Sequence, residues 1–124
     1  MGYSYFSGVA ANISVAVNSA AELTRVSDVP PGVWLVCTCM NYYQSATSAR
    51  VKLYVGTSSG LSDVLGVQML QIINSDYMGH SASIVYNNTS TNTFWLNMAV
   101  NVAGPVKTYT ETSRMSFLQM TRIA

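Results

Sequence analysis

The sequence predicts an all-β protein, a single β-sandwich or jelly-roll domain built from about eight short antiparallel strands. Apolar residues recur with a period of two along most of the chain, which is typical of strands with one buried face. Gly, Pro and Asn clusters interrupt the apolar runs at short intervals and mark the turns. The segments 30–36 and 115–124 both have the character of buried strands, so the sandwich is expected to extend to the end of the chain.

Each expected strand is an alternating segment bounded by turn residues. The clearest is 94–102, in which Phe94, Leu96 and Met98 alternate with Trp95 and Asn97. The other candidates are residues 12–17, 23–27, 33–43, 50–55, 67–73, 81–86 and 115–123. Turn residues separate them at 30–32, 56–60, 74–76, 87–88 and 104–105. Helix is expected over no more than a turn or two, near residues 63–66.

The strand over residues 33–43 is apolar on both faces. Its two faces carry Val33, Leu35, Cys37 and Cys39 on one side and Trp34, Val36, Thr38 and Met40 on the other. A two-layered sandwich covers only one face of each sheet, so the second apolar face implies a partner or a covering loop. Trp95, which faces away from Phe94 and Leu96, supports the same inference.

The chain carries unusually little charge. Charged residues make up 9% of the 124 residues and the formal net charge is +1, whereas about a quarter of a typical soluble domain is charged. The six basic residues are scattered, so the sequence lacks the clustered Lys and Arg that nucleic-acid binding needs. So little charge protects a monomer poorly against association, which suggests a surface covered by partners. A monomer solvated by Ser and Thr is the alternative.

The chain length fits one domain. Residues 1–10 are expected to form an N-terminal arm and residues 11–124 the domain. No apolar run reaches the roughly 20 residues that cross a bilayer, and the N-terminus lacks the features of a secretion signal. We therefore expect no membrane contact, and synthesis and use without export.

Catalytic and metal-binding motifs are weak. Gly56-Thr57-Ser58-Ser59-Gly60 fits a hydrolase nucleophile pattern, but it joins two expected strands rather than a strand and a helix. The sole histidine, His80, is expected in a loop. No nucleotide-binding loop occurs. We therefore expect no enzyme and no cofactor.

Cys37 and Cys39 leave the same face of one expected strand, with Cα atoms about 6.5 to 7 Å apart. That separation disfavours a disulfide, so two small buried thiols are expected. Together with the distant His80 they are too few for a zinc site, and we expect no metal.

Several segments resemble a known group of virion proteins. Val29-Pro-Pro-Gly-Val-Trp-Leu-Val36 resembles the proline-glycine-x-aromatic-x-valine strand of the complement and tumour-necrosis-factor jelly rolls. The runs 81–86, 93–100 and 117–124 are similar to those of fibre heads and capsid decoration proteins of tailed bacteriophages. The resemblance covers about residues 10–124 and implies a homotrimer around a threefold axis. It makes Trp34, Trp95 and Phe117 candidates for the trimer interface, although any one of them could instead belong to the core.

The resemblance suggests a capsid decoration, or cement, protein. Such a trimer would bind the major capsid protein on the outer surface of the virion, after synthesis in the host cytoplasm, and stabilise the shell. Tyr3, Tyr5 and Phe6 of the N-terminal arm would then anchor it to the capsid.

The alternative is the receptor-binding head of a tail or capsid fibre, whose loops 57–63 and 87–92 would contact a host glycan. A small lectin or carbohydrate-binding module unconnected with a virion is a third possibility.

Overall fold

The computed structural model describes residues 3–9, 12–16, 18–44, 49–57, 65–72, 76–101, 106–108 and 116–124. Within these residues the chain forms ten β-strands. They are β1 (Ser4–Gly8), β2 (Ser14–Val15), β3 (Ser19–Val29), β4 (Gly32–Gln44), β5 (Ala49–Gly56), β6 (Gly66–Ile72), β7 (Asp76–Asn88), β8 (Asn92–Asn101), β9 (Val106–Thr108) and β10 (Phe117–Arg122). The described residues contain no helix long and apolar enough to cross a membrane.

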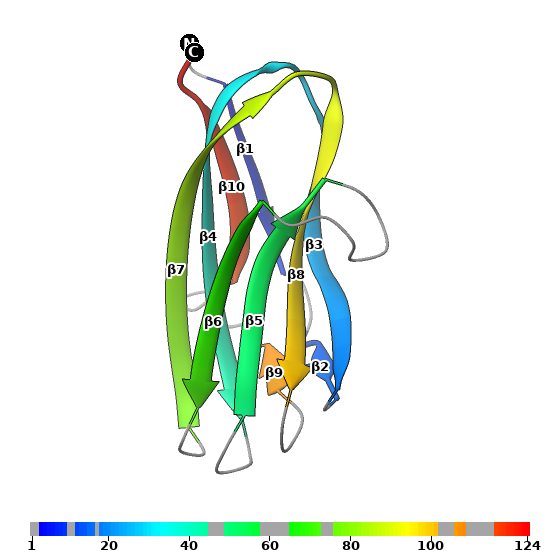
Figure 1. Cartoon of the computed structure of the whole chain (residues 1–124), viewed down its shortest axis with the longest axis vertical. Coiled ribbons are helices and arrows are strands. Elements are labelled where there is room, and N and C mark those ends of the chain that lie inside the picture. The colour runs from blue at the N-terminus through cyan, green and yellow to red at the C-terminus, as the bar shows by residue number, and fades with distance from the viewer. Residues whose placement is uncertain are drawn as a thin grey trace.

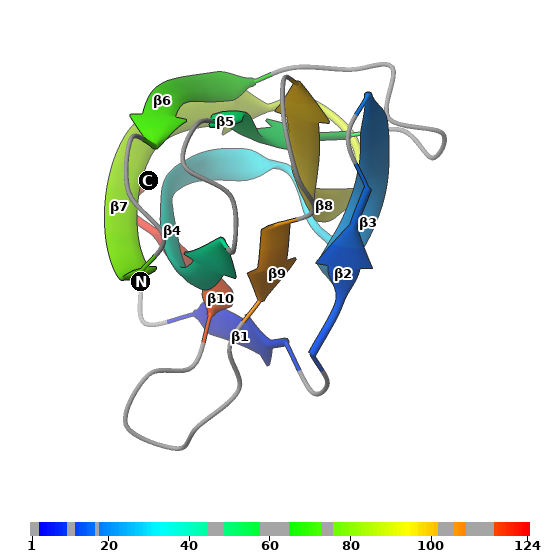
Figure 2. The ribbon, with the colours of Figure 1, turned by 90° about the horizontal axis from the view of Figure 1, so that it is seen from below.

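The strands form two antiparallel sheets that pack face to face as a jelly-roll sandwich (Figure 1). The first, here the β4 sheet, contains β1, β10, β4 and β7, and the short strands β9 and β2 join its lower end. The second, here the β8 sheet, has the order β3-β8-β5-β6. Seen from below, β9 and β2 lie between β4 and β3 (Figure 2). The sequence-based expectation of an all-β sandwich is confirmed.

The two segments that suggested a closed sandwich are neighbours in the β4 sheet. β10 pairs with β4 from Phe117 opposite Cys39 to Arg122 opposite Trp34. The Val33 amide donates to the Ala124 carbonyl at 2.9 Å, so the pairing continues to the end of the chain. On its other edge β4 pairs with β7 over its full length, which places β4 at the centre of the sheet.

The core lies between the inner faces of the two sheets. Its largest fully buried side chains include Trp34 and Met40 of β4, Phe94 and Leu96 of β8, and Leu118 of β10. Each such side chain contributes about 1.5–3 kcal/mol on burial. The expected inward face is confirmed for Phe94, Leu96, Met98 and Val100, whereas Val102 lies outside the described residues. Of the two apolar faces of β4, the one that carries Trp34 faces the core.

β3 departs from strict alternation. Its buried apolar residues, Leu23, Val26 and Val29, are three residues apart, and the register with β8 shifts between Glu22 and Thr24 and again between Val26 and Val29. Each shift adds one residue to β3 and forms a β-bulge. Asp28 within the second shift has a positive φ of 57°, a conformation that Asp tolerates better than most residues. The bulges place Glu22 and Arg25 on the same outer face.

Two parts of the fold differ from the sequence-based expectation. Residues 4–8, expected within an arm outside the domain, form β1 and pair with β10 from Ser4 opposite Thr121 to Gly8 opposite Phe117. Residues 106–108 form β9, which was not anticipated. Of the segment expected to contain a helical turn, residues 63–64 lie outside the described residues and Gly66 begins β6.

Candidate functional site

The outer face of the β4 sheet carries no formal charge across β1, β10, β4 and β7 over the β4 residues Val33 to Asn41. The described residues on it are Ser4, Phe6 and Gly8 of β1, Phe117, Gln119 and Thr121 of β10, Val33, Leu35, Cys37, Cys39 and Asn41 of β4, and Gly79, Ser81, Ser83, Val85 and Asn87 of β7. None of these carries a formal charge. We call this surface the uncharged face. Beyond its lower end, the register places Lys107 of β9 opposite Tyr43 of β4.

The uncharged face contains two apolar spots near opposite edges. At one edge Phe6 of β1 is 58% exposed and its ring lies 5.3 Å from that of Phe117. Toward the other edge Val85 of β7, also 58% exposed, pairs with the partly exposed Leu35. Cys37 and Cys39, both free thiols, lie half-buried between the spots. Contiguous exposed apolar patches mark interaction sites, whereas single exposed apolar residues are common on soluble proteins.

The structure separates the three expected interface residues. Phe117 lies on the uncharged face, as a partner contact requires. Trp34 is 0% exposed and its indole Nε1 donates to the Pro30 carbonyl at 3.1 Å, so it is a core residue and the expectation that it faces a partner is corrected. Trp95 is partly exposed on the outer face of the other sheet. One flat interface cannot contain both Phe117 and Trp95.

The three aromatic residues expected to anchor an arm also differ in position. Tyr5 points inward and packs on Trp34 with ring centroids 5.6 Å apart, because strand alternation places it on the core side. Tyr3 is 59% exposed and Phe6 is 58% exposed. Contact of Tyr3 or Phe6 with a capsid stays a prediction, whereas Tyr5 belongs to the packing of the domain.

The outer face of the β8 sheet has the opposite character. Cross-strand register places Arg25 opposite Trp95, and Glu22 opposite Asn97, which in turn pairs with Tyr54 of β5. The Lys52 ammonium lies 4.9 Å from the centroid of the Tyr54 ring. Burial raises the pKa of the Tyr54 hydroxyl, and the negative charge of Glu22 raises it further.

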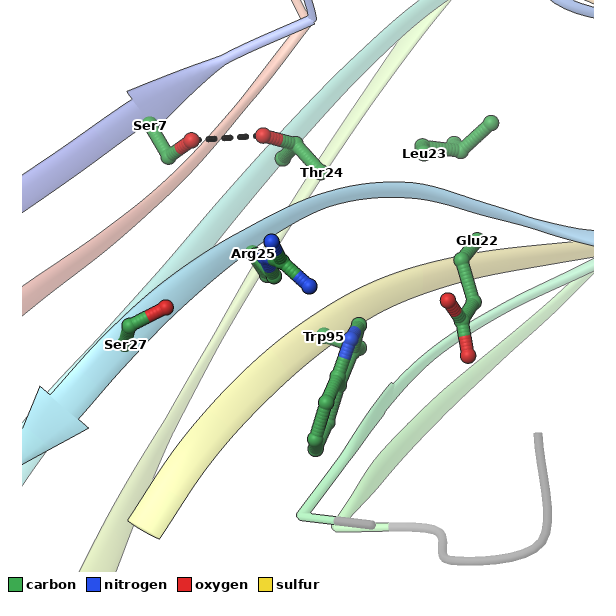
Figure 3. Close-up of a pocket in the computed structure, with 7 residues that line it drawn as sticks. All are labelled: Ser7, Glu22, Leu23, Thr24, Arg25, Ser27 and Trp95. Atoms are coloured by element: carbon green, nitrogen blue, oxygen red, sulfur yellow. Dashed lines mark hydrogen bonds between the residues drawn. The ribbon is translucent and has the colours of Figure 1, made fainter. Parts of the chain in front are cut away.

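A hollow of about 450 Å³ opens on this second face, beside the edge of β3 that approaches β1 (Figure 3). Its lining consists of Ser7, Glu22, Leu23, Thr24, Arg25, Ser27 and Trp95. Ser7 Oγ and Thr24 Oγ1 are hydrogen-bonded at 2.5 Å, and the Thr24 hydroxyl lies 3.3 Å from the Gly8 carbonyl, which it can donate to. These contacts join the edge strands of the two sheets and fix the wall of the hollow.

Asn97, next to the hollow, has a fully buried side chain. It is 0% exposed, and among the described residues neither its amide nitrogen nor its amide oxygen has a hydrogen-bond partner. A buried polar group without a partner costs about 1–3 kcal/mol. Such groups are rare in folded proteins; among the described residues the Tyr42 hydroxyl and His80 Nε2 are also buried without a hydrogen-bond partner.

Tyr42 and His80 form a stacked pair inside the lower half of the sandwich, with ring centroids 5.7 Å apart. Burial raises the pKa of Tyr42 to about 12 and lowers the pKa of the His80 imidazole. His80 lies in β7 opposite the core residue Met40, so its expected position in a loop is wrong. Ser58 and the rest of the Gly-Thr-Ser-Ser-Gly motif beyond Thr57 lie outside the described residues.

The loops expected to contact a glycan are only partly described. Residues 58–63 lie outside the described part of the chain. In the other loop, the Asn88 amide donates to the carbonyls of Val29 at 3.1 Å and Pro30 at 2.9 Å, and the Asn92 amide donates to Asn88 Oδ1 at 2.7 Å. These two side chains therefore hold the β7–β8 turn against the β3–β4 turn.

Metal binding finds no geometric support in the described residues. No group of three or more His, Cys, Asp or Glu side chains lies together there.

The sequence matches no family model and no curated protein. Solved structures match over nearly the whole chain. Eiger, a tumour-necrosis-factor protein of S. frugiperda, has 14% identity and a TM-score of 0.60, covering 98% of this chain and 91% of that one. A protein of the T13 particle of infectious bursal disease virus has 7% identity and a TM-score of 0.71, covering 97% of this chain and 31% of that one.

A third match is the CBM36-1 domain of a multidomain xylanase from the hindgut metagenome of Trinervitermes trinervoides. It has 11% identity and a TM-score of 0.50, covering 98% of this chain and 99% of that one. The present chain spans less than a third of the viral protein it matches. At these identities the likeness concerns the fold, and it confirms the jelly roll that the sequence predicted; the bacteriophage part of the resemblance stays a prediction.

Proposed function

We propose that this protein is a structural virion protein that assembles as a homotrimer through its uncharged face and attaches to the outer surface of a capsid, where it stabilises the shell. The observation that carries the proposal is the uncharged face itself. Water solvates charged side chains best, so a sheet face without them loses little when a partner covers it. The proposal involves no catalysis.

The arrangement of apolar side chains supports a closed ring of copies. The Phe6–Phe117 spot and the Leu35–Val85 spot lie near different edges of the same face. Contact between the first spot of one copy and the second spot of the next is a heterologous interface, which closes into a ring when the rotation between copies allows it. The resemblance to complement and tumour-necrosis-factor jelly rolls favours three copies.

The virion assignment depends on the resemblance to decoration proteins and on the fold shared with a viral particle protein. The major capsid protein would be the second partner. Tyr3, which is exposed and whose carbonyl accepts a hydrogen bond from the Arg122 amide, is our candidate for that contact.

The first test measures the mass of the assembly in solution by light scattering. We expect three times the chain mass of 13.4 kDa. Val85→Asp places a charge in the interface and should weaken assembly by at least about 100-fold. Ala20→Asp is the matched control, because Ala20 is exposed on the β8 sheet; it should leave the mass unchanged. A wild-type monomer, or equal effects of the two variants, would contradict assembly through this face.

The second test concerns the shell. Capsids assembled without the protein should bind it to saturation at a fixed ratio to the major capsid protein and should then release DNA at a higher temperature. An unchanged release temperature would overturn the stabilising role, and binding to host cells alone would favour the fibre-head alternative.

A further inference from the structure

We propose that the hollow beside Trp95 binds a neutral sugar unit of a glycan. Glu22, Arg25 and Trp95 face the outer side of the β8 sheet, opposite the uncharged face, and the hollow extends from them along the edge of β3 to Ser7 of β1. The ligand-binding groups therefore differ from those proposed for assembly, and we expect both sites to be occupied at once.

Trp95 provides the apolar surface on which a sugar ring would stack. Its side chain points away from the core and is partly exposed, although the neighbours Phe94 and Leu96 are fully buried. An exposed indole provides a rigid, flat apolar surface with a negatively polarised face. The weakly positive C–H groups on one side of a pyranose ring match that surface.

The side chains around Trp95 supply hydrogen-bond donors and acceptors for sugar hydroxyls. Figure 3 shows Arg25 and Glu22 on either side of the Trp95 ring. A guanidinium offers only donors and a carboxylate only acceptors, so the pair can bind adjacent hydroxyls, each of which both donates and accepts. The Ser27 hydroxyl and the Ser7 oxygen extend this set along the wall.

Charge selects the class of ligand. Arg25 and Glu22 are the charged residues that line the hollow, and their formal charges cancel. A phosphate, sulfate or uronate would meet the Glu22 carboxylate, and a cation would meet the Arg25 guanidinium. A neutral polyol avoids both penalties, and the combination of an apolar platform with few convergent polar groups is typical of small-molecule sites.

Asn97 provides an independent observation. It lies two residues along β8 from Trp95, on the same face, and directly opposite Glu22. Its amide has both a donor and an acceptor without partners among the described residues. A displacement of the overlying side chains would let a second sugar hydroxyl reach this amide, so a glycan chain would extend from Trp95 toward Tyr54.

The test uses neutral tetrasaccharides of glucose, galactose and mannose, with tetragalacturonate as an anionic probe of equal length. Binding is followed by calorimetry and by acrylamide quenching of tryptophan fluorescence. Trp34 is buried, so quenching reports on Trp95. At least one neutral probe should bind and protect Trp95. Failure of all three neutral probes, or binding of tetragalacturonate alone, would overturn the proposal.

Variants assign the binding to the hollow. Trp95→Ala should weaken the best neutral probe about 30-fold, and Glu22→Gln, which preserves shape, about tenfold. Equal affinities of Trp95→Ala and the wild type for this probe would contradict binding in the hollow. Val85→Asp should bind the sugar with unchanged affinity, and Trp95→Ala should keep the assembled mass, so failure of either proposal is distinguishable from failure of the other.

Discussion

The two sheets contribute alike to the core but differ on their outer faces. The β4 sheet presents Phe6, Phe117 and Val85 among uncharged polar residues, whereas the β8 sheet presents Glu22 and Arg25 near Trp95 and Lys52 beside Tyr54. The uncharged face therefore differs in charge from the outer face of the β8 sheet. A composition averaged over a chain can conceal two surfaces suited to different partners, one apolar and extended, the other polar and local.

The largest expected difference between the inner and outer faces is the effect of substituting the two tryptophans, Trp34 and Trp95, on stability. Trp34→Ala should lower the free energy of unfolding by about 3–5 kcal/mol, because it removes a fully buried side chain and leaves a cavity. Trp95→Ala, on an outer face, should cost less than about 1 kcal/mol. Urea denaturation at a concentration where the protein is monomeric would measure both. Trp34→Phe serves as a milder core variant, and equal losses at the two positions would contradict the assignment of inner and outer faces.

An effect of intermediate magnitude is expected for the reactivity of the two thiols on the uncharged face. Cys37 and Cys39 are half-buried there in the single chain, and a neighbouring copy would cover them. Their reaction with a thiol reagent should slow about tenfold, equivalent to about 1.4 kcal/mol, as the protein is concentrated from monomer to assembly. Val85→Asp is the control and should react at the monomer rate at every concentration. A rate independent of concentration in the wild type would place the interface elsewhere.

The smallest expected effect concerns the buried amide beside the hollow. Asn97→Leu replaces an unpaired buried amide by an apolar group of similar shape and should raise stability by about 1 kcal/mol, or the Tm by about 4 °C. Asn88→Leu is the matched control, because that amide donates to Val29 and Pro30; it should instead lose about 1–3 kcal/mol. Destabilisation by Asn97→Leu, measured calorimetrically, would show that the amide is satisfied.

The sequence predicted the strands whose pattern is local. Alternation around Phe94 and Leu96 placed β8 correctly, and the two-sided apolar pattern of Val33–Met40 placed one face of β4 outside the core. The prediction that residues 4–8 belong to an arm outside the domain was wrong, because these residues form β1 by pairing with β10. No local sequence pattern indicates a pairing between segments so far apart in the chain. The three-residue spacing of Leu23, Val26 and Val29 was a detectable signal of the bulges.

The candidate sites were less predictable than the fold. Trp95 was singled out by its orientation, but its neighbours Arg25 and Glu22 are set by the shifted register between β3 and β8. Strand register across a bulge depends on tertiary packing rather than on sequence alone. Trp34 was misassigned because both faces of β4 are apolar, and only the position of the second sheet decides which of them is buried.

The outer ends of β1 and β10 lie at the same pole of the sandwich (Figure 1), where the Arg122 amide donates to the Tyr3 carbonyl at 2.9 Å. A short linker could therefore join the ends without crossing either sheet face, so the domain should tolerate circular permutation. For the same reason, a peptide fused to either end would project in one direction and leave the hollow and the opposite pole accessible. The domain is in this respect a ready scaffold for displaying a fused peptide in a fixed orientation.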